Sequence, residues 1–194
     1  KFKETFYQVK NEREKVDILW IVDNSGSMED EQDSLARNFD LFIEEFLKKD
    51  IDFKMAITTT DPYDYGRPIK DIEGLTQEEA LKDEANFLDD FIERVRVGIK
   101  GYGKEQGLTT SLNFLDRYGA SFLRKDAFLI LIYISDENDQ SGFSIDHFHR
   151  RVVVHKSNPN QVKVFSIVNL KGHSHSYYES PGERYCTLSE KTGG

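Results

Sequence analysis

The chain alternates between two kinds of segment, and this alternation restricts its fold more than any other feature. Short runs rich in β-branched and aromatic residues predict buried strands, and they span 16–22, 51–58, 127–134 and 162–168. Segments with apolar residues every three or four positions lie between them. Strands joined by helical crossovers form a parallel sheet. We therefore expect an α/β fold, a doubly wound and mostly parallel sheet with helices on both faces.

The helical segments differ in how clearly they are marked. The predicted helices span about 30–49, 76–96 and 107–118, with weaker patterns over 144–156 and 182–192. In the second of these, the apolar stripe includes Leu81, Ala85 and Val95. Thr76 and Glu79 have the spacing of a capping box at the start of that helix.

Composition excludes several classes of protein. The 194 residues suit a single domain. With 26 basic and 35 acidic side chains the net charge is −9, and the absence of a basic block argues against binding nucleic acid or an anionic membrane through charge. No apolar run in the sequence approaches the roughly 20 residues that span a bilayer, so we expect no membrane span. The single cysteine excludes an internal disulfide framework and a multi-cysteine metal cluster.

The sequence divides into an extension and one domain. Residues 1–15 are a polar N-terminal extension without the apolar region of a signal peptide. Because the chain starts at Lys1, we expect a mature form or a cut piece of a longer protein, from which a targeting segment has been removed. The domain covers 16–194, and 60–75, rich in Pro, Gly and Asp, is predicted as a surface loop or small insertion.

A cluster of oxygen-bearing side chains follows the first predicted strand. In the sequence DNSGSM, Asp23, Ser25 and Ser27 alternate, so their oxygens can converge, and Gly26 permits a tight turn between them. One carboxylate and two hydroxyls suit Mg²⁺, Mn²⁺ or Ca²⁺ better than zinc. Such residues also cap helices, and that simpler interpretation fits the motif taken alone.

Two further loops strengthen the metal interpretation. The strand 127–134 is followed by Asp136, and the Gly-rich segment 101–108 precedes a predicted helix. Open parallel sheets bind ligands beyond the carboxyl ends of their strands. Three loops with oxygen donors at one sheet edge are hard to explain by helix capping.

These motifs resemble a von Willebrand factor A (vWA) domain. VDILWIVDNSGSM, a helix, a later Gly-rich loop and a strand ending in ISDE cover about 16–194, and bacterial vWA domains of exported surface proteins are the most similar in style. The resemblance implies a metal-ion-dependent adhesion site (MIDAS) in which Asp23, Ser25 and Ser27 form the first loop and Asp136 the third. The family normally adds a final strand, so the domain can be slightly truncated at its closing TGG.

The second loop departs from the family pattern. The family usually has a Thr there, followed by aliphatic residues two and six positions later, and Leu108 and Leu112 fit if Gln106 holds the Thr position. Either Gln106 ligates the metal through its amide oxygen, or Glu105 ligates it through its carboxylate. A carboxylate would make the metal less attractive to an external acid.

Other acidic residues lie near these loops. Asp30 and Glu31 have the spacing of the adjacent cation site of integrin β-subunit domains, but an acidic first helical turn is favoured by the helix dipole, and we prefer that explanation. Glu137 and Asp139 flank the third loop, as supporting groups or as simple loop acids.

The resemblance implies binding and not catalysis. The sequence has no G-x-S-x-G or nucleotide-binding P-loop, and Ser25 stands where a phosphotransferase has its second Asp. We expect metal-dependent adhesion, with Mg²⁺ as the first choice and Ca²⁺ or Mn²⁺ as alternatives. A protein or cell-envelope partner would supply an Asp or Glu carboxylate to a monomeric, extracytoplasmic domain on the cell surface or secreted. Two alternatives stay open, an intracellular scaffold of an ATP-driven complex and, less favoured, a metal-dependent phosphohydrolase.

Overall fold

Four parallel strands form one sheet in this computed structural model, which describes residues 13–171 and 180–194. The strand order is β2-β1-β3-β4, and every neighbouring pair is parallel. The strands are β1 (Lys15–Val22), β2 (Asp52–Thr59), β3 (Phe128–Ser135) and β4 (Val162–Val168). Each strand starts and ends within one residue of its predicted bounds. Residues 1–12, most of the predicted extension, lie outside the described residues.

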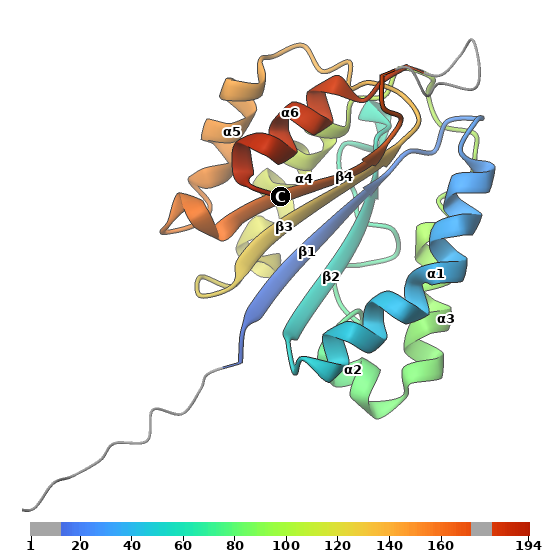
Figure 1. Cartoon of the computed structure of the whole chain (residues 1–194), viewed down its shortest axis with the longest axis vertical. Coiled ribbons are helices and arrows are strands. Elements are labelled where there is room, and N and C mark those ends of the chain that lie inside the picture. Colours follow the sequence, from blue (N-terminus) through green and yellow to red (C-terminus); the bar gives the residue numbers. More distant parts are fainter. Residues whose placement is uncertain (1–12, 172–179) are drawn as a thin grey trace, which may run out of the picture.

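Helices cover both faces of the sheet (Figure 1). One face carries α1 (Glu29–Lys48), α2 (Gln77–Lys82) and α3 (Glu84–Val95). The other carries α4 (Gly107–Phe122), α5 (Ile145–Val153) and α6 (Glu183–Thr192). Short 3-10 turns are η1 (Pro62–Asp64) and η2 (Pro159–Gln161). The predicted α/β fold with helices on both faces is confirmed.

The sheet has this cover because its central strands are apolar on both sides. In β3, Leu131 and Tyr133 are fully buried against α4, α5 and α6, while Ile132 and Ile134 join the core beneath α1 and α3. A strand of this kind reads as a continuous apolar run, since alternate side chains enter different cores. The sheet therefore separates two hydrophobic clusters.

The predicted helix over 76–96 is wrong in two respects. It is two helices, because Asp83 ends α2 and its side chain caps α3. The break also changes which residues face the core: Leu81 is 62% exposed and Ala85 is exposed, whereas Phe87 and Phe91 are buried. The predicted stripe assumes one helical phase over 76–96, but the chain starts a new helix at Asp83, and the buried face changes there.

The segment 60–75 runs along the outer edge of β2 and pairs with it. The N–H of Ile69 donates to the carbonyl of Ile57 at 2.8 Å, and the N–H of Met55 donates to the carbonyl of Leu75 at 2.8 Å. An unpaired strand edge is a site for unwanted association. The segment therefore has a structural role besides connecting two elements.

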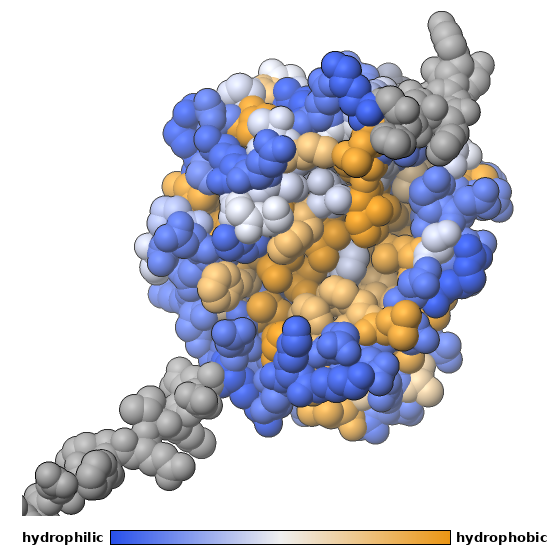
Figure 2. Space-filling view, viewed as in Figure 1, coloured by the Kyte–Doolittle hydropathy of each residue, from blue (hydrophilic) through white to orange (hydrophobic). Residues whose placement is uncertain are grey.

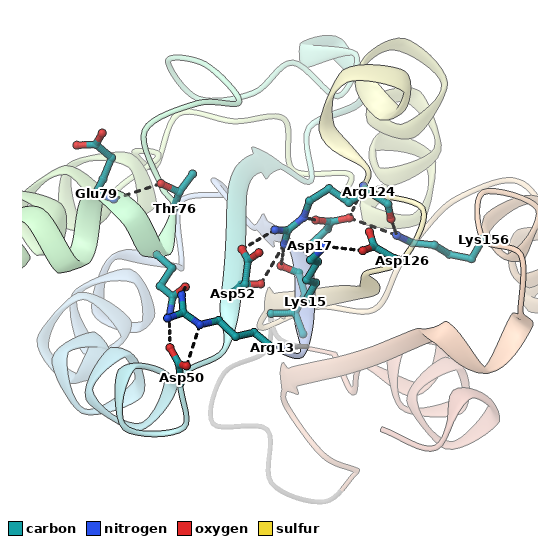
Figure 3. Close-up of polar contacts among 12 residues, drawn as sticks. Arg13, Lys15, Asp17, Asp50, Asp52, Thr76, Glu79, Arg124, Asp126 and Lys156 are labelled. Atoms are coloured by element: carbon teal, nitrogen blue, oxygen red, sulfur yellow. Dashed lines mark hydrogen bonds and ion pairs between the residues drawn. The ribbon is translucent and has the colours of Figure 1, made fainter. Parts of the chain in front are cut away.

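A buried ionic network locks the end of the sheet where the strands begin (Figure 3). The fully buried carboxylate of Asp17 accepts hydrogen bonds from Arg124 Nε at 2.8 Å and Lys156 Nζ at 3.2 Å. Arg124 also binds Asp52 at 2.5 Å. The network joins β1 and β2 to the segments after α4 and α5.

Part of the sheet on the α1 side has no described helix over it. Figure 2 shows this region as an apolar hollow at the centre of the view. Ile130, Phe165 and Ile167 line a cavity of about 410 Å³ between α1 and β4, and Phe165 and Ile167 are 43% and 59% exposed. Because parallel sheets are normally covered on both faces, this region is the least covered part of the described sheet.

The carboxyl ends of the strands meet at one edge, towards the top of Figure 1. From β1 the chain moves outward to β2, then returns to the other side of β1 for β3 and β4. The strand order thus reverses between β1 and β3, and at such a point the loops separate and leave room for a ligand. The motif loops that follow β1 and β3 lie on either side of this point.

Candidate metal centre

The first loop is held in a tight turn directly beyond β1. The N–H of Asp23 donates to the carbonyl of Ile134 at 2.9 Å, which extends the pairing of β1 with β3. One carboxylate oxygen of Asp23 accepts the N–H of Ser25 at 2.8 Å, and the hydroxyl oxygens of Ser25 and Ser27 are 3.3 Å apart. Hydrogen bonds therefore link Asp23 to Ser25 and Ser25 to Ser27, and their joint role as metal ligands stays a prediction. Asp23 is fully buried, whereas Ser27 is exposed, so the cluster opens to solvent on the serine side.

Residues of α1 fix this loop from behind. The amide of Gln32 donates to the carbonyl of Asp23 at 2.8 Å and to the carbonyl of Gly98 at 2.9 Å. Met28, between the loop and the helix, is fully buried in the core beneath α1. The loop therefore has a hydrogen-bonded and a hydrophobic anchor.

The third loop meets the first at the end of β3. Asp136 is 4% exposed, and its carbonyl accepts the N–H of Ser180 at 3.2 Å. The neighbouring Ser135 donates its hydroxyl to the second carboxylate oxygen of Asp23 at 2.6 Å. Asp136 lies close enough to Asp23 for its charge to contribute to the raised pKa of Asp23.

In the second loop, Glu105 and Gln106 have different surroundings. The side chain of Gln106 precedes α4 and accepts a hydrogen bond from the hydroxyl of Thr109 at 3.3 Å, within the first turn of that helix. Glu105 is fully buried, and its carbonyl accepts the N–H of Gln140 at 2.8 Å. The negative charge of Asp23 contributes to the raised pKa of Glu105, so the two buried acids share one region. Of the two residues, Glu105 is the one positioned with the first loop.

The acids of this centre have strongly perturbed ionisation. The pKa of Glu105 is raised to about 8, chiefly by burial and next by the negative charge of Asp23, with a smaller contribution from Glu137. Burial is also the largest cause of the raised pKa of Asp23, which hydrogen bonds from Ser135 and Ser25 partly offset. Neither Asp23 nor Glu105 has an ion pair within the described residues. Buried acids without a positive partner are costly to ionise, so this centre favours a cation.

Glu137 and Asp139, which the sequence left undistinguished, take different positions. Asp139 caps α4 by accepting the N–H of Leu108 at 3.0 Å, and it binds Arg184 Nε at 2.9 Å. It therefore connects the third loop, α4 and α6. Glu137 faces Glu105, and burial raises its pKa. Asp139 is thus a structural residue, and Glu137 belongs to the acidic centre.

Asp30 and Glu31 lie in the exposed first turn of α1, as the helix-dipole interpretation predicts. They line a cleft of about 420 Å³ whose other wall includes Asp136 and Val168. The structure thus places them beside the centre without assigning them to a second cation, and the adjacent site stays a prediction.

The expected donors include the carboxylates of Asp23, Asp136 and Glu105, and these three do not form a preassembled metal cage in the described structure. Within residues 13–171 and 180–194, no group of three or more His, Cys, Asp or Glu side chains is arranged to hold a metal by itself. Two of the expected donors are serine hydroxyls, as in the sequence motif. Glu105 provides the direct test of fit, because its Oε1 is buried and has no hydrogen-bond partner among the described residues. A buried oxygen without a hydrogen-bond partner requires an explanation, and coordination of a cation provides one.

Sequence reasoning missed two residues at this edge. Ser135 binds Asp23, and Thr60, 1% exposed after β2, has a buried hydroxyl without a partner in the described structure. Both residues come shortly after a predicted strand, so their positions in the sequence could have indicated that they lie at this edge.

Comparisons with known proteins identify the fold. No protein-family model and no curated protein matches the chain. Among solved structures, the chain is similar to proximal thread matrix protein 1 (PTMP1) from the mussel byssus, with a TM-score of 0.52 and 13% sequence identity. The match covers 93% of this chain and 47% of that chain. The chain has the von Willebrand factor A fold.

Two further solved structures give weaker matches. PTMP1 with a zinc-occupied MIDAS motif has a TM-score of 0.46 at 13% identity, with 93% of this chain and 44% of that chain covered. The pilus adhesin SpaC from Lactobacillus rhamnosus GG, in its open conformation, has a TM-score of 0.43 at 17% identity, with 67% and 15% covered. The chain spans about half the length of PTMP1. At 13% identity the first match shows the fold alone, and we conclude nothing from the two weaker matches.

Proposed function

We propose that this vWA chain is a metal-dependent binding domain that holds one divalent cation at the centre described above. The observation that carries the proposal is the buried, unpartnered Oε1 of Glu105 beside the carboxylate of Asp23, with no basic side chain paired to either in the described residues. Folding places these acids together at a free-energy cost, and a bound cation removes that cost.

Each residue has a role in this proposal. Asp23 and Asp136 hold the ion, Ser25 and Ser27 position it, and Glu105 closes the third side. Gln106 is the less suitable second-loop ligand, because its amide oxygen bonds to α4. When bound, the cation supplies an electrophilic centre that accepts an oxygen from outside the domain. Mg²⁺ is our first choice for a hydroxyl-containing site, and Ca²⁺ and Mn²⁺ are the alternatives.

We propose adhesion as the purpose of this binding. The partner is a protein or cell-envelope ligand whose Asp or Glu carboxylate completes the coordination of the metal. The domain acts as a monomer outside the cytoplasm, on the cell surface or secreted, and we propose a bacterial surface protein. The exposed hydroxyl of Ser27 leaves the solvent side of the centre accessible to such a partner. No helix in the described residues is long and apolar enough to cross a membrane.

Binding fits the local geometry better than catalysis. The hydroxyl of Ser25 contacts the hydroxyl of Ser27, and the carboxylate of Asp23 is engaged by Ser135 and the Ser25 N–H. A nucleophilic serine needs a free general base, and the carboxylate next to Ser25 is that of Asp23, which already accepts hydrogen bonds from Ser135 and the Ser25 N–H and which we assign to the cation. No observation favours the scaffold or phosphohydrolase alternatives.

A thermal-unfolding titration tests the proposal. Millimolar Mg²⁺, Ca²⁺ or Mn²⁺ should raise the Tm of the wild type, because a ligand of the native state stabilises it. Asp23→Ala should remove the increase while the protein remains folded. Asp126→Ala, which changes an exposed carboxylate near the start of β3, is the matched control and should respond like the wild type. An equal increase in Asp23→Ala and wild type would contradict the proposal.

A further inference from the structure

A small aromatic surface lies beside the candidate metal centre. Tyr63 of η1 and Tyr102 of the second loop are 63% and 46% exposed, and their ring centroids are 5.1 Å apart at an interplanar angle of 80°. Ile99, 38% exposed, lies three residues before Tyr102 in the sequence. We call Tyr63, Ile99 and Tyr102, with Lys100 and Lys104, the tyrosine platform. Exposed aromatic side chains are the residues that protein interfaces use most.

One buried carboxylate fixes both tyrosines. Asp61, 9% exposed, accepts the N–H of Tyr63 at 2.8 Å through one oxygen and the N–H of Tyr102 at 2.9 Å through the other. The two rings come from segments about 40 residues apart, so this arrangement is a product of folding and not of local sequence. The hydrogen bonds fix the backbone at both tyrosines, which reduces the entropy that is lost when a partner binds there.

The platform is also fixed to the metal centre. The N–H of Gly101 donates to the carbonyl of Asn24 at 2.7 Å, and Asn24 lies between Asp23 and Ser25 in the first loop. A Cβ at Gly101 would lie 2.3 Å from Asn24 Oδ1, so the two loops approach as closely as glycine permits. A partner at the cation would therefore be within reach of Tyr102.

The charge around Tyr102 is opposite to that of the whole chain. Lys100 and Lys104 lie two residues before and two residues after Tyr102 in the sequence, both are exposed, and neither has an ion pair within the described residues. The adjacent Glu105 is buried and presents no charge outward. In a chain of net charge −9, these lysines form a local basic surface next to a proposed dication. Such a surface attracts an acidic partner.

We propose that the tyrosine platform is the docking surface for an acidic polypeptide segment. The inference rests on the proposed function. One carboxylate of the segment reaches the cation, neighbouring carboxylates pair with Lys100 and Lys104, and an apolar or aromatic side chain packs against Tyr63, Ile99 and Tyr102. The near-perpendicular rings favour a polypeptide over an acidic polysaccharide, because they form no coplanar surface for successive sugar rings.

Binding to defined polymers tests this surface. Immobilised random glutamate–tyrosine copolymer is the probe, with polyglutamate and alginate in parallel, in millimolar Mg²⁺ or in EDTA. The wild type should bind the copolymer more tightly than polyglutamate or alginate, and only with the cation. Lys100→Glu with Lys104→Glu should weaken this binding by about tenfold or more, and Tyr102→Ala by about five- to tenfold.

Controls separate this inference from the proposed function. Lys49→Glu with Lys125→Glu makes the same charge change at exposed positions near the opposite end of the sheet and should bind like the wild type. The cation-induced increase in Tm should persist in all these variants. If it persists while the wild type ignores the copolymer, prefers alginate, or binds equally in platform variants or EDTA, the platform is overturned and the metal centre stands. If the wild type shows no cation response, the proposed function fails.

Discussion

Replacing Glu105 by Gln should stabilise the metal-free protein and weaken its response to a cation. Glu105 is fully buried, with a pKa raised to about 8 chiefly by burial and next by Asp23. In the unfolded chain a Glu ionises near pH 4.3. Between these values the folded protein binds more protons than the unfolded chain, so its stability falls as the pH rises from about 4.5 to about 8.

The magnitude follows from these two pKa values. At pH near 7.5 the burial of Glu105 opposes folding by at most about 4 kcal/mol, and near pH 5 by only about 1 kcal/mol. Gln has nearly the same shape and no charge, so Glu105→Gln should recover most of this free energy. For a domain of this size, 1 kcal/mol corresponds to about 2–4 °C in Tm. We expect the variant to melt about 8–15 °C above the wild type in EDTA near pH 7.5, with a difference of only a few degrees near pH 5.

Calorimetric or fluorescence melting curves at both pH values measure this effect, with exposed Glu84→Gln as the matched control. Added Mg²⁺ or Ca²⁺ should raise the Tm of the wild type more than that of Glu105→Gln, because the variant lacks one carboxylate ligand. A variant that melts at or below the wild-type temperature in EDTA near pH 7.5 would refute the reasoning.

Three further predictions concern the centre, the ionic network and one glycine. Cation affinity measured by titration calorimetry should fall as the pH drops below about 8, by up to tenfold per pH unit, because a proton competes for Glu105; unchanged affinity down to pH 6 or so would count against its role as a ligand. Asp17→Ala leaves the buried Lys156 unpaired and should lower the free energy of unfolding, measured in urea, by about 3–5 kcal/mol. Loss of an exposed ion pair typically costs under about 1 kcal/mol, and a cost that small would contradict the burial of the network. Gly66→Ala should lower it by about 2–4 kcal/mol, since Gly66 has a φ of +67° and a new Cβ would lie 2.4 Å from the Thr110 carbonyl oxygen; Gly142→Ala, with open space around it, should be nearly neutral.

The sheet could be predicted from the sequence because its signals are local and repeated. Runs such as 127–134 are apolar on every residue, and only a strand with two covered faces accommodates that pattern in so short a segment. Helix starts were also marked to within one residue, whereas α4 continues to Phe122, α5 ends at Val153, and the break at Asp83 was missed. There the side chain of Asp83 caps a new helix within a pattern that looks continuous in the sequence. As a result, Phe87 and Phe91 are the buried residues of that helix. Which of two overlapping stripes is buried depends on contacts with α1, and these contacts are not local.

The candidate centre was only partly predictable for a similar reason. The alternation of Asp23, Ser25 and Ser27 specifies the first loop, since neighbouring residues are enough to bring their oxygens together. The choice between Glu105 and Gln106 depends on how the second loop lies against the third, through the N–H of Gln140 and the cap supplied by Asp139. Such long-range hydrogen bonds leave no local pattern. The same holds for Asp61, whose carboxylate joins Tyr63 to Tyr102.

Anomalous X-ray scattering from crystals soaked in Mn²⁺ tests the central claim most directly, because Mn²⁺ is one of the proposed cations and gives a measurable anomalous signal. The account predicts one anomalous peak within coordination distance of side-chain oxygens from Asp23, Ser25, Asp136 and Glu105. A strong peak elsewhere, or none at this position in a crystal whose packing leaves the loops accessible, would contradict it.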